Sequence, residues 1–239
     1  MIPDWHTQAE FDRRIEARSA SSTIPQPFSV WYHVACMGNW WDVFTEQRQL
    51  FASVGLAPTA CVLGPPADVE YVRSLMPVAY SSPDLQEFET PTLQKLWEWC
   101  SEHQKGAVLY IHTKGVSAPH DANKVAWRRL MARYVIEPWK TNLALLAEFD
   151  ILGIDWQQSP TYPHFAGNFW MARADWIAHL PAPVDYRRQG GPWIAEQPWE
   201  RMHAEMWLGS RPYHHVKNFC CHDENLWCGD RVFQLLNDL

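Results

Sequence analysis

The stretch AVLYIHTKGVS, residues 107–117, decides the fold class. Five apolar or aromatic residues follow one another without a polar interruption, and the run then stops at His112, Thr113 and Lys114. An uninterrupted run of this length is typical of a strand covered on both faces, as the strands of parallel sheets are. We therefore predict a strand over residues 107–111 that carries its polar groups at its carboxyl end.

Strand and helix patterns alternate before this stretch. The predicted strands lie at 28–36, 59–64 and 77–82, and the predicted helices at 40–54, 67–75 and 90–105. Asn39 is the predicted cap of the first helix, and Gly55 ends it. Alternation with short connections implies crossovers between parallel strands, with helices on the faces of the sheet. In such sheets ligands bind outside the carboxyl ends of the strands, where His33 and the group His112–Gly115 both lie.

The second half of the chain carries weaker patterns. We predict a long helical stretch over 123–149, broken or kinked at Pro138, then a strand over 150–156 and a segment over 168–180 that begins extended and turns helical. A further helix ends at Gly209, and the tail after it has no assignable pattern. The fold class predicted from these elements is α/β, with a mostly parallel central sheet flanked by helices.

Composition and charge narrow the class of protein. A chain of 239 residues can bury one substantial core, so we predict a Ser/Pro-rich arm or linker over 1–27 and a single domain over 28–239. The formal net charge of -7 argues against general binding to nucleic acid or to anionic membranes. Without an apolar signal segment or a membrane-length apolar run, a cytoplasmic protein is expected, and its six cysteines are then expected to be free thiols.

The polar group after residue 111 suits a phosphate or pyrophosphate. Lys114 offers a point charge, Thr113 a hydroxyl donor, and the backbone around Gly115 N–H groups that could form an anion nest. The alternative is a plain surface loop in which the lysine is only solvated.

Two further clusters could carry chemistry. Gly167 and Asn168 precede Phe169 and Trp170, and an amide beside an aromatic face can hold a sugar. A simple turn in front of a packed strand explains the same residues. Glu205, between Ala204 and Met206-Trp207, is the candidate general base, whereas Glu196 and Glu200 fit an exposed helix face.

The tail CCHDENLWC, residues 220–228, has the residue types of a zinc site but not the spacing of paired CxxC motifs. We therefore expect structural or incidental cysteines there. The dinucleotide motif GxGxxG, the P-loop, the GxSxG hydrolase motif and the HExxH metalloprotease motif do not occur in the sequence.

Five segments, taken in order, carry a resemblance to a known family. They are WYHVACMGNWWDVFTEQRQLFASVGL, LYIHTKGVS, WRRLMARYVIEPWKTNLALLAEFDILGIDW, PHFAGNFWMARADWIAHLP and AEMWLGS. Together they resemble a family of glycosyltransferases similar to rhamnan-synthesis-F-type polysaccharide proteins. The resemblance covers roughly residues 28–210.

The resemblance implies a GT-A-like single domain that uses a nucleotide-activated sugar. In that fold an Asp-x-Asp motif normally binds a divalent metal after the fourth strand, and here His112-Thr113-Lys114 stands in its place. We therefore expect metal-independent transfer and assign no metal ligand, although Mn²⁺ or Mg²⁺ held by Asp155 or His112 stays open. The residues assigned to the nucleotide-sugar are Tyr32, His33, Asn39, His112, Thr113, Lys114, Gly115 and Arg128. Those assigned to the sugar or acceptor pocket are Asp155, His164, Asn168 and Trp170, with Glu205 as the catalytic base.

The expected function is transfer of a sugar, with inversion, from a nucleotide-sugar to a glycan, glycolipid or other hydroxyl acceptor, in surface polysaccharide synthesis. Three alternatives stay open. They are a non-catalytic carbohydrate-binding module, a transferase acting on modified nucleic-acid bases, and a zinc hydrolase built on the Cys/His-rich tail.

Overall fold

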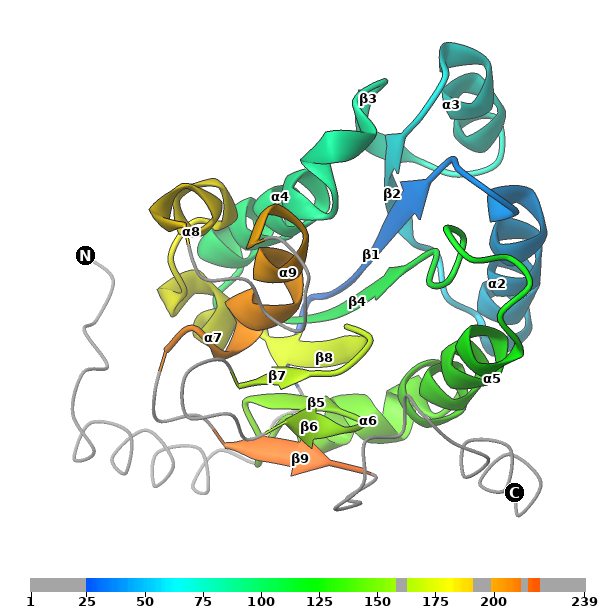
Figure 1. Cartoon of the computed structure of the whole chain (residues 1–239). Helices are drawn as coiled ribbons and strands as arrows, with labels where there is room; N and C mark the ends of the chain where they lie inside the picture. Colours follow the sequence, from blue (N-terminus) through cyan, green and yellow to red (C-terminus); the bar gives the residue numbers. More distant parts are fainter. Residues whose placement is uncertain (1–24, 158–162, 191–198, 212–214, 220–239) are drawn as a thin grey trace.

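A computed structural model describes residues 25–157, 163–190, 199–211 and 215–219. Most of the predicted arm and the whole of the Cys/His-rich tail from residue 220 lie outside these residues. So does Glu196. The chain is built around one seven-stranded sheet with helices on both faces (Figure 1).

The first half of the chain follows the predicted alternation closely. The strands are β1 (Phe28–Ala35), β2 (Thr59–Leu63), β3 (Val78–Ser82) and β4 (Ala107–His112), and the helices are α2 (Trp40–Val54), α3 (Pro66–Arg73) and α4 (Thr90–Glu102). Helix α2 ends at Gly55 in the left-handed conformation, as predicted. Asn39 does precede α2, but the prediction that its side chain caps the helix is wrong, because that side chain makes no capping hydrogen bond.

The second half contains shorter elements. The helical stretch divides into α5 (Ala122–Met131), a π-helical turn (Ala132–Ile136) and α6 (Trp139–Leu145), with the break at Pro138 as predicted. The remaining strands are β5 (Ile151–Gly153), β6 (Trp156–Gln157), β7 (His164–Phe165), β8 (Trp170–Arg173) and β9 (Val216–Asn218). The remaining helices are α7 (Ala174–His179), α8 (Pro183–Gln189) and α9 (Trp199–Met206), the last followed by a 3-10 turn (Trp207–Gly209).

The strand order of the main sheet is β3-β2-β1-β4-β8-β5-β9. The pairs among β1 to β4 are parallel, as is the β5–β9 pair, and only β8 runs antiparallel to its two neighbours. The sheet is therefore mostly parallel, as predicted. Strands β6 and β7 form a separate two-stranded ribbon.

Two hydrophobic clusters cover the two faces of the sheet. Side chains alternate along a strand, so Tyr32 of β1 packs with Phe44 and Phe51 of α2 on one face, while Trp31 joins Leu93 of α4 on the other. Every residue of β4 is buried, because this strand lies in the middle of the sheet and is covered on both sides. This double coverage is what the apolar run at 107–111 predicts.

The strand order contains a reversal next to β1. The chain builds β2 and β3 on one side of β1 and then places β4 on its other side. Such a switch point leaves a crevice outside the carboxyl ends of the two strands, where open α/β sheets bind their ligands. Among the described residues, no helix is long and apolar enough to cross a membrane.

Candidate functional site

A cavity of about 270 Å³ lies at this switch point, and we call it the sheet-edge cavity. Its walls come from the ends of β1 and β4, the turn before α4, helix α5 and helix α9. Six of the predicted site residues line it: His33, His112, Thr113, Lys114, Gly115 and Glu205. Residues more than 90 positions apart in the sequence therefore meet in one cavity.

The loop after β4 is held in place by backbone contacts. The backbone N–H of Thr113 donates to the His33 carbonyl at 3.0 Å, and its hydroxyl accepts from the Ala35 N–H at 3.0 Å. Thr113 thereby ties the end of β4 to the end of β1. Gly115 has a φ of 89°, a left-handed conformation that favours glycine, and it turns the loop towards α5.

Lys114 and Glu205 form an ion pair across the cavity. The Nζ atom of Lys114 lies 3.4 Å from Oε1 of Glu205, and the two side chains are only 10% and 15% exposed. Lys124 of α5 and Arg201 of α9 line the same cavity. These two cations had no functional signal in the sequence, since a lone basic residue on a helix is usually solvated.

Glu89 is the main site residue that the sequence does not reveal. It lines the cavity at the start of α4, and its Oε2 accepts hydrogen bonds from the Tyr110 hydroxyl and from Nδ2 of Asn168, both at 2.6 Å. Its Oε1 lies 3.1 Å from Nδ1 of His112. Burial alone would raise the pKa of the Glu89 carboxyl, but the rings of His112 and His33 and the hydrogen bond from Tyr110 hold the pKa well below its ordinary range. Glu89 is therefore a fixed carboxylate.

The two histidines of the cavity differ in their surroundings. Nε2 of His112 lies 3.0 Å from the Gly167 carbonyl, so both ring nitrogens of His112 face acceptor oxygens. Burial lowers the pKa of His33 to about 4, against the charge of nearby Glu89, and the ring pairs with the Thr92 hydroxyl at 2.8 Å. His33 is thus neutral at pH 7.

Four predicted residues do not line the cavity but form hydrogen bonds that position the residues lining it. The Tyr32 hydroxyl donates to Gln47, whose amide donates to the His112 carbonyl. Arg128 donates to the Lys114 carbonyl at 3.0 Å and pairs with Glu46. Asn168 accepts from Nε1 of Trp170 at 2.8 Å while it donates to Glu89. The geometry therefore gives Tyr32, Arg128, Asn168 and Trp170 positions that hold other site residues in place.

Three predicted residues lie elsewhere. Asn39 is absent from the lining of the cavity, as are Asp155 and His164 near the β6–β7 ribbon. Asp155 is buried with a φ of 56°, and burial raises its pKa to about 6 although Gln157 donates to it. Such backbone strain at a buried carboxyl is unusual, but no described cavity reaches it.

The sequence left open whether the protein has a group of side chains that could bind a metal ion. Within residues 25–157, 163–190, 199–211 and 215–219, no three His, Cys, Asp or Glu side chains are grouped to hold a metal ion. The proposed zinc ligands of residues 220–228 lie outside the described residues. Cys36, Cys61 and Cys100, the three cysteines within them, are free thiols as predicted.

Fold and site together define an α/β protein with a cavity, lined by three cations and two carboxylates, at the carboxyl edge of a mostly parallel sheet. The family described as "Domain of unknown function (DUF8361)" matches residues 78–221, more than half of the chain. The chain belongs to this family. The matched residues contain Glu89, the loop after β4 and Glu205, so most of the cavity lies within the family's region. No curated protein matches the sequence.

Proposed function

We propose that the protein is a glycosyltransferase that binds a nucleotide-diphosphate sugar in the sheet-edge cavity. The observation that carries this proposal is the charge of the cavity. Lys114, Lys124 and Arg201 gather in one small space at the switch point of the sheet, although the whole chain has a net charge of -7. A concentration of cations against the overall charge favours an anionic ligand such as a diphosphate.

The strand order supports the same ligand class. The order β3-β2-β1-β4 is that of the nucleotide-binding half of doubly wound folds, which hold their nucleotides outside the carboxyl ends of the strands. The GT-A-like assignment drawn from the resemblance fits this arrangement. On this proposal the lysine and arginine side chains neutralise the diphosphate in place of the metal that an Asp-x-Asp motif would hold.

Glu205 is the better candidate for the catalytic base. The other carboxylate of the cavity, Glu89, accepts three interactions and has a lowered pKa, which makes it a poor proton acceptor. Glu205 has a single described partner, Lys114. A donor diphosphate would compete for that lysine and release the Glu205 carboxylate.

The proposed reaction then proceeds as one displacement. Glu205 takes the proton of an acceptor hydroxyl, and the hydroxyl oxygen forms a bond to the anomeric carbon of the donor sugar. The bond between that carbon and the phosphate oxygen breaks at the same time, so the nucleoside diphosphate leaves with the bonding electron pair. The sugar is transferred with inversion. Polysaccharide synthesis as the process and the cytoplasm as the location are likewise proposals.

The test is a thermal-shift screen against UDP-, GDP-, dTDP- and CMP-linked sugars, with and without Mn²⁺. A ligand that binds only the folded state raises its melting temperature. We expect a rise with one family of diphosphate donors, present without Mn²⁺, and release of the corresponding nucleoside diphosphate on incubation. A folded sample that shows no shift with any donor would contradict the proposal, and a shift that requires Mn²⁺ would contradict its metal-independent form.

A further inference from the structure

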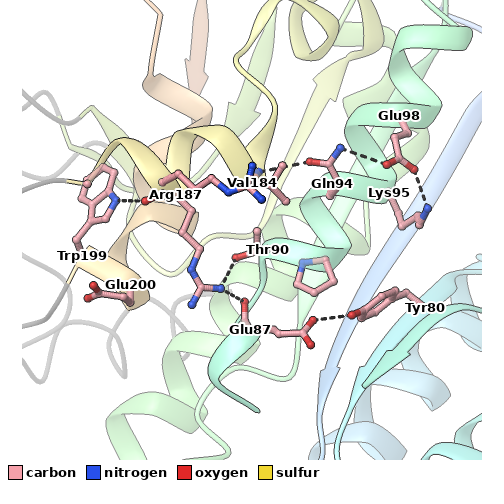
Figure 2. A pocket seen from close by; sticks show the side chains of 13 residues that line it. Tyr80, Glu87, Thr90, Gln94, Lys95, Glu98, Val184, Arg187, Trp199 and Glu200 are labelled. Carbon is pink, nitrogen blue, oxygen red and sulfur yellow. Dashed lines mark hydrogen bonds and ion pairs between the residues drawn. The ribbon is translucent and has the colours of Figure 1, made fainter. Parts of the chain in front are cut away.

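A second and larger cavity, of about 710 Å³, lies beside the first between α4, α8 and α9, and we call it the helical cavity. Figure 2 shows its walls: Gln94, Lys95 and Glu98 extend from α4, Arg187 crosses from α8, and Tyr80 closes one side. Its volume is that of a site for a ligand of several rings. The reaction proposed above does not use this cavity for the donor.

The two cavities share two walls. In the turn before α4, Phe88 and Glu89 line the sheet-edge cavity, whereas Glu87 and the first residue of α4, Thr90, line the helical cavity. Helix α9 contributes to both as well, with Glu205 in the first cavity and Glu200 in the second. A ligand in the helical cavity is therefore adjacent to the proposed site of transfer.

Arg187 fixes the shared turn rather than offering an anion site. Its guanidinium donates to the carbonyls of Glu87 at 3.0 Å and Gln86 at 2.7 Å, and to the Thr90 hydroxyl at 3.2 Å. Figure 2 shows the side chain reaching from α8 to this turn. Because three of its five N–H donors are directed to protein oxygens, Arg187 has less capacity to bind phosphate or carboxylate than a solvated arginine has.

The charges of the helical cavity balance. Three cationic side chains, Lys95, Arg187 and Arg188, stand against three carboxylates, Glu87, Glu98 and Glu200. In the sheet-edge cavity, Lys114, Lys124 and Arg201 stand against two carboxylates, Glu89 and Glu205, which leaves one cation in excess. The difference indicates a neutral ligand for the helical cavity, and it disfavours nucleic acid or an acidic peptide.

The polar groups of the helical cavity are already oriented by their neighbours. Glu98 accepts from Lys95 at 2.8 Å and from Gln94 at 3.2 Å, and Glu87 accepts from the Tyr80 hydroxyl at 2.7 Å. Sugar hydroxyls both donate and accept, so they can bond to carboxylates and to ammonium or amide groups in the same site. The rings of Tyr80 and Pro91 add flat apolar surface.

From these features we propose that the helical cavity binds a neutral carbohydrate, which serves as the acceptor of the transfer. The acceptor role rests on the proposed function, whereas carbohydrate binding does not. The Glu200 and Trp199 end of α9 then holds one part of the acceptor glycan, and the glycan extends past the shared turn so that its reacting hydroxyl reaches Glu205 in the sheet-edge cavity.

The test measures binding of simple glycosides by saturation-transfer NMR. The probes are methyl glycosides of common hexoses and 6-deoxyhexoses at millimolar concentration, applied to the full chain. Gln94→Trp should fill the cavity and abolish binding of the glycoside that the wild type selects. Glu98→Gln should weaken that binding at least about tenfold through loss of charge-assisted hydrogen bonds. Glu102→Gln is the matched control, because it makes the same change on the exposed end of α4, outside the cavity, and should leave binding unchanged.

The outcomes separate this proposal from the proposed function. Glycoside binding that both cavity variants reduce supports the carbohydrate site, even if no nucleotide-sugar binds and the transferase proposal fails. If a nucleotide-sugar binds but no glycoside does, the transferase stands and the second site is wrong. The carbohydrate site is also overturned if Gln94→Trp leaves glycoside binding unchanged. The same conclusion follows if a nucleoside diphosphate displaces the bound glycoside. The melting temperature of each variant shows that it is folded.

Discussion

At the scale of single residues, the role of each charged side chain in the sheet-edge cavity depends on the groups that it contacts. Glu89 and Glu205 are both glutamates of the same cavity, yet one is held by three donors and the other only by Lys114 among the contacts described. Residue type alone does not distinguish them. On the proposed function, their different environments suit Glu89 to a structural role and Glu205 to proton transfer.

Lys114→Ala should weaken binding of the diphosphate donor by about 10- to 100-fold, because a charge-assisted contact to phosphate is lost. Isothermal titration with the donor found in the thermal-shift screen measures the change. The control is Lys105→Ala, since Lys105 precedes the same strand β4 at the opposite edge of the sheet and is exposed. Equal affinities for the two variants would remove Lys114 from the donor site.

Glu205→Gln should leave donor affinity within about twofold and reduce turnover by about 10²- to 10⁴-fold, as expected for a lost general base. Product formation under saturating donor, followed by chromatography, measures the effect. A variant that loses donor affinity and turnover to the same mild extent would show that Glu205 has no specific catalytic role.

Glu89→Gln should lower the free energy of unfolding by about 3 kcal/mol, because hydrogen bonds from Tyr110 and Asn168 to a buried carboxylate are weakened. Urea denaturation at pH 7 measures this loss. A variant as stable as the wild type would mean that the network around Glu89 is not needed for folding.

At the scale of elements, the cavity depends on how the loop after β4 packs against the loop after β1. Gly38 has a φ of 57°, and a Cβ atom there would lie 1.7 Å from the Val116 carbonyl oxygen. Val116 lines the sheet-edge cavity. The close approach of these two loops therefore shapes the cavity, and only glycine permits it.

Gly38→Ala should displace the loop that contains Lys114 and Val116, and it should reduce both stability and donor binding. Gly55→Ala is the matched control, because Gly55 also has a positive φ of 73° but no atom lies within 4 Å of its Cβ position. The control should lose only about 1–2 kcal/mol from backbone strain and keep its donor affinity. Urea denaturation and donor titration test both variants, and similar behaviour of the two would contradict the packing argument.

At the scale of the whole molecule, buried titratable groups set the dependence of stability on pH. Burial lowers the pKa of His33 to about 4, so between pH 6.5 and 4 the unfolded chain binds a proton that the folded chain does not. The contribution of His33 to stability is thus greatest above pH 6.5 and falls as the pH drops towards 4. Burial lowers the pKa of His203 as well and acts in the same direction, whereas the raised pKa of Asp155 acts in the opposite one.

His33→Gln should therefore make the protein less sensitive to acid. Between pH 7 and pH 5 the wild type should lose roughly 2 kcal/mol more of its unfolding free energy than the variant does. Urea denaturation at the two pH values measures this difference. Parallel losses in the two proteins would show that His33 titrates normally in the folded state.

The sequence by itself determined the elements of the first half of the chain and the position of the group His112–Gly115 at the end of a buried strand. Apolar periodicity, the glycine after α2 and the proline before α6 are local signals. They predict these elements because local backbone preferences fix where the elements begin and end. The short α8 and β9 were not predicted, because elements of seven and three residues carry too little periodicity of their own. Strand β8 is the extended start predicted for residues 168–180, but its antiparallel direction was not predicted, because that direction depends on its partner strands.

Only the tertiary structure decided which side chains meet. Tyr32 and His33 are neighbours on β1, but their side chains lie on opposite faces, so one packs against α2 and the other lines the cavity. Glu89, Lys124 and Arg201 enter that cavity from three separate elements, and nothing near them in the sequence indicates it. Convergence of distant segments depends on packing between elements, and therefore the partners of Glu205 and the existence of the helical cavity could be found only in the folded chain.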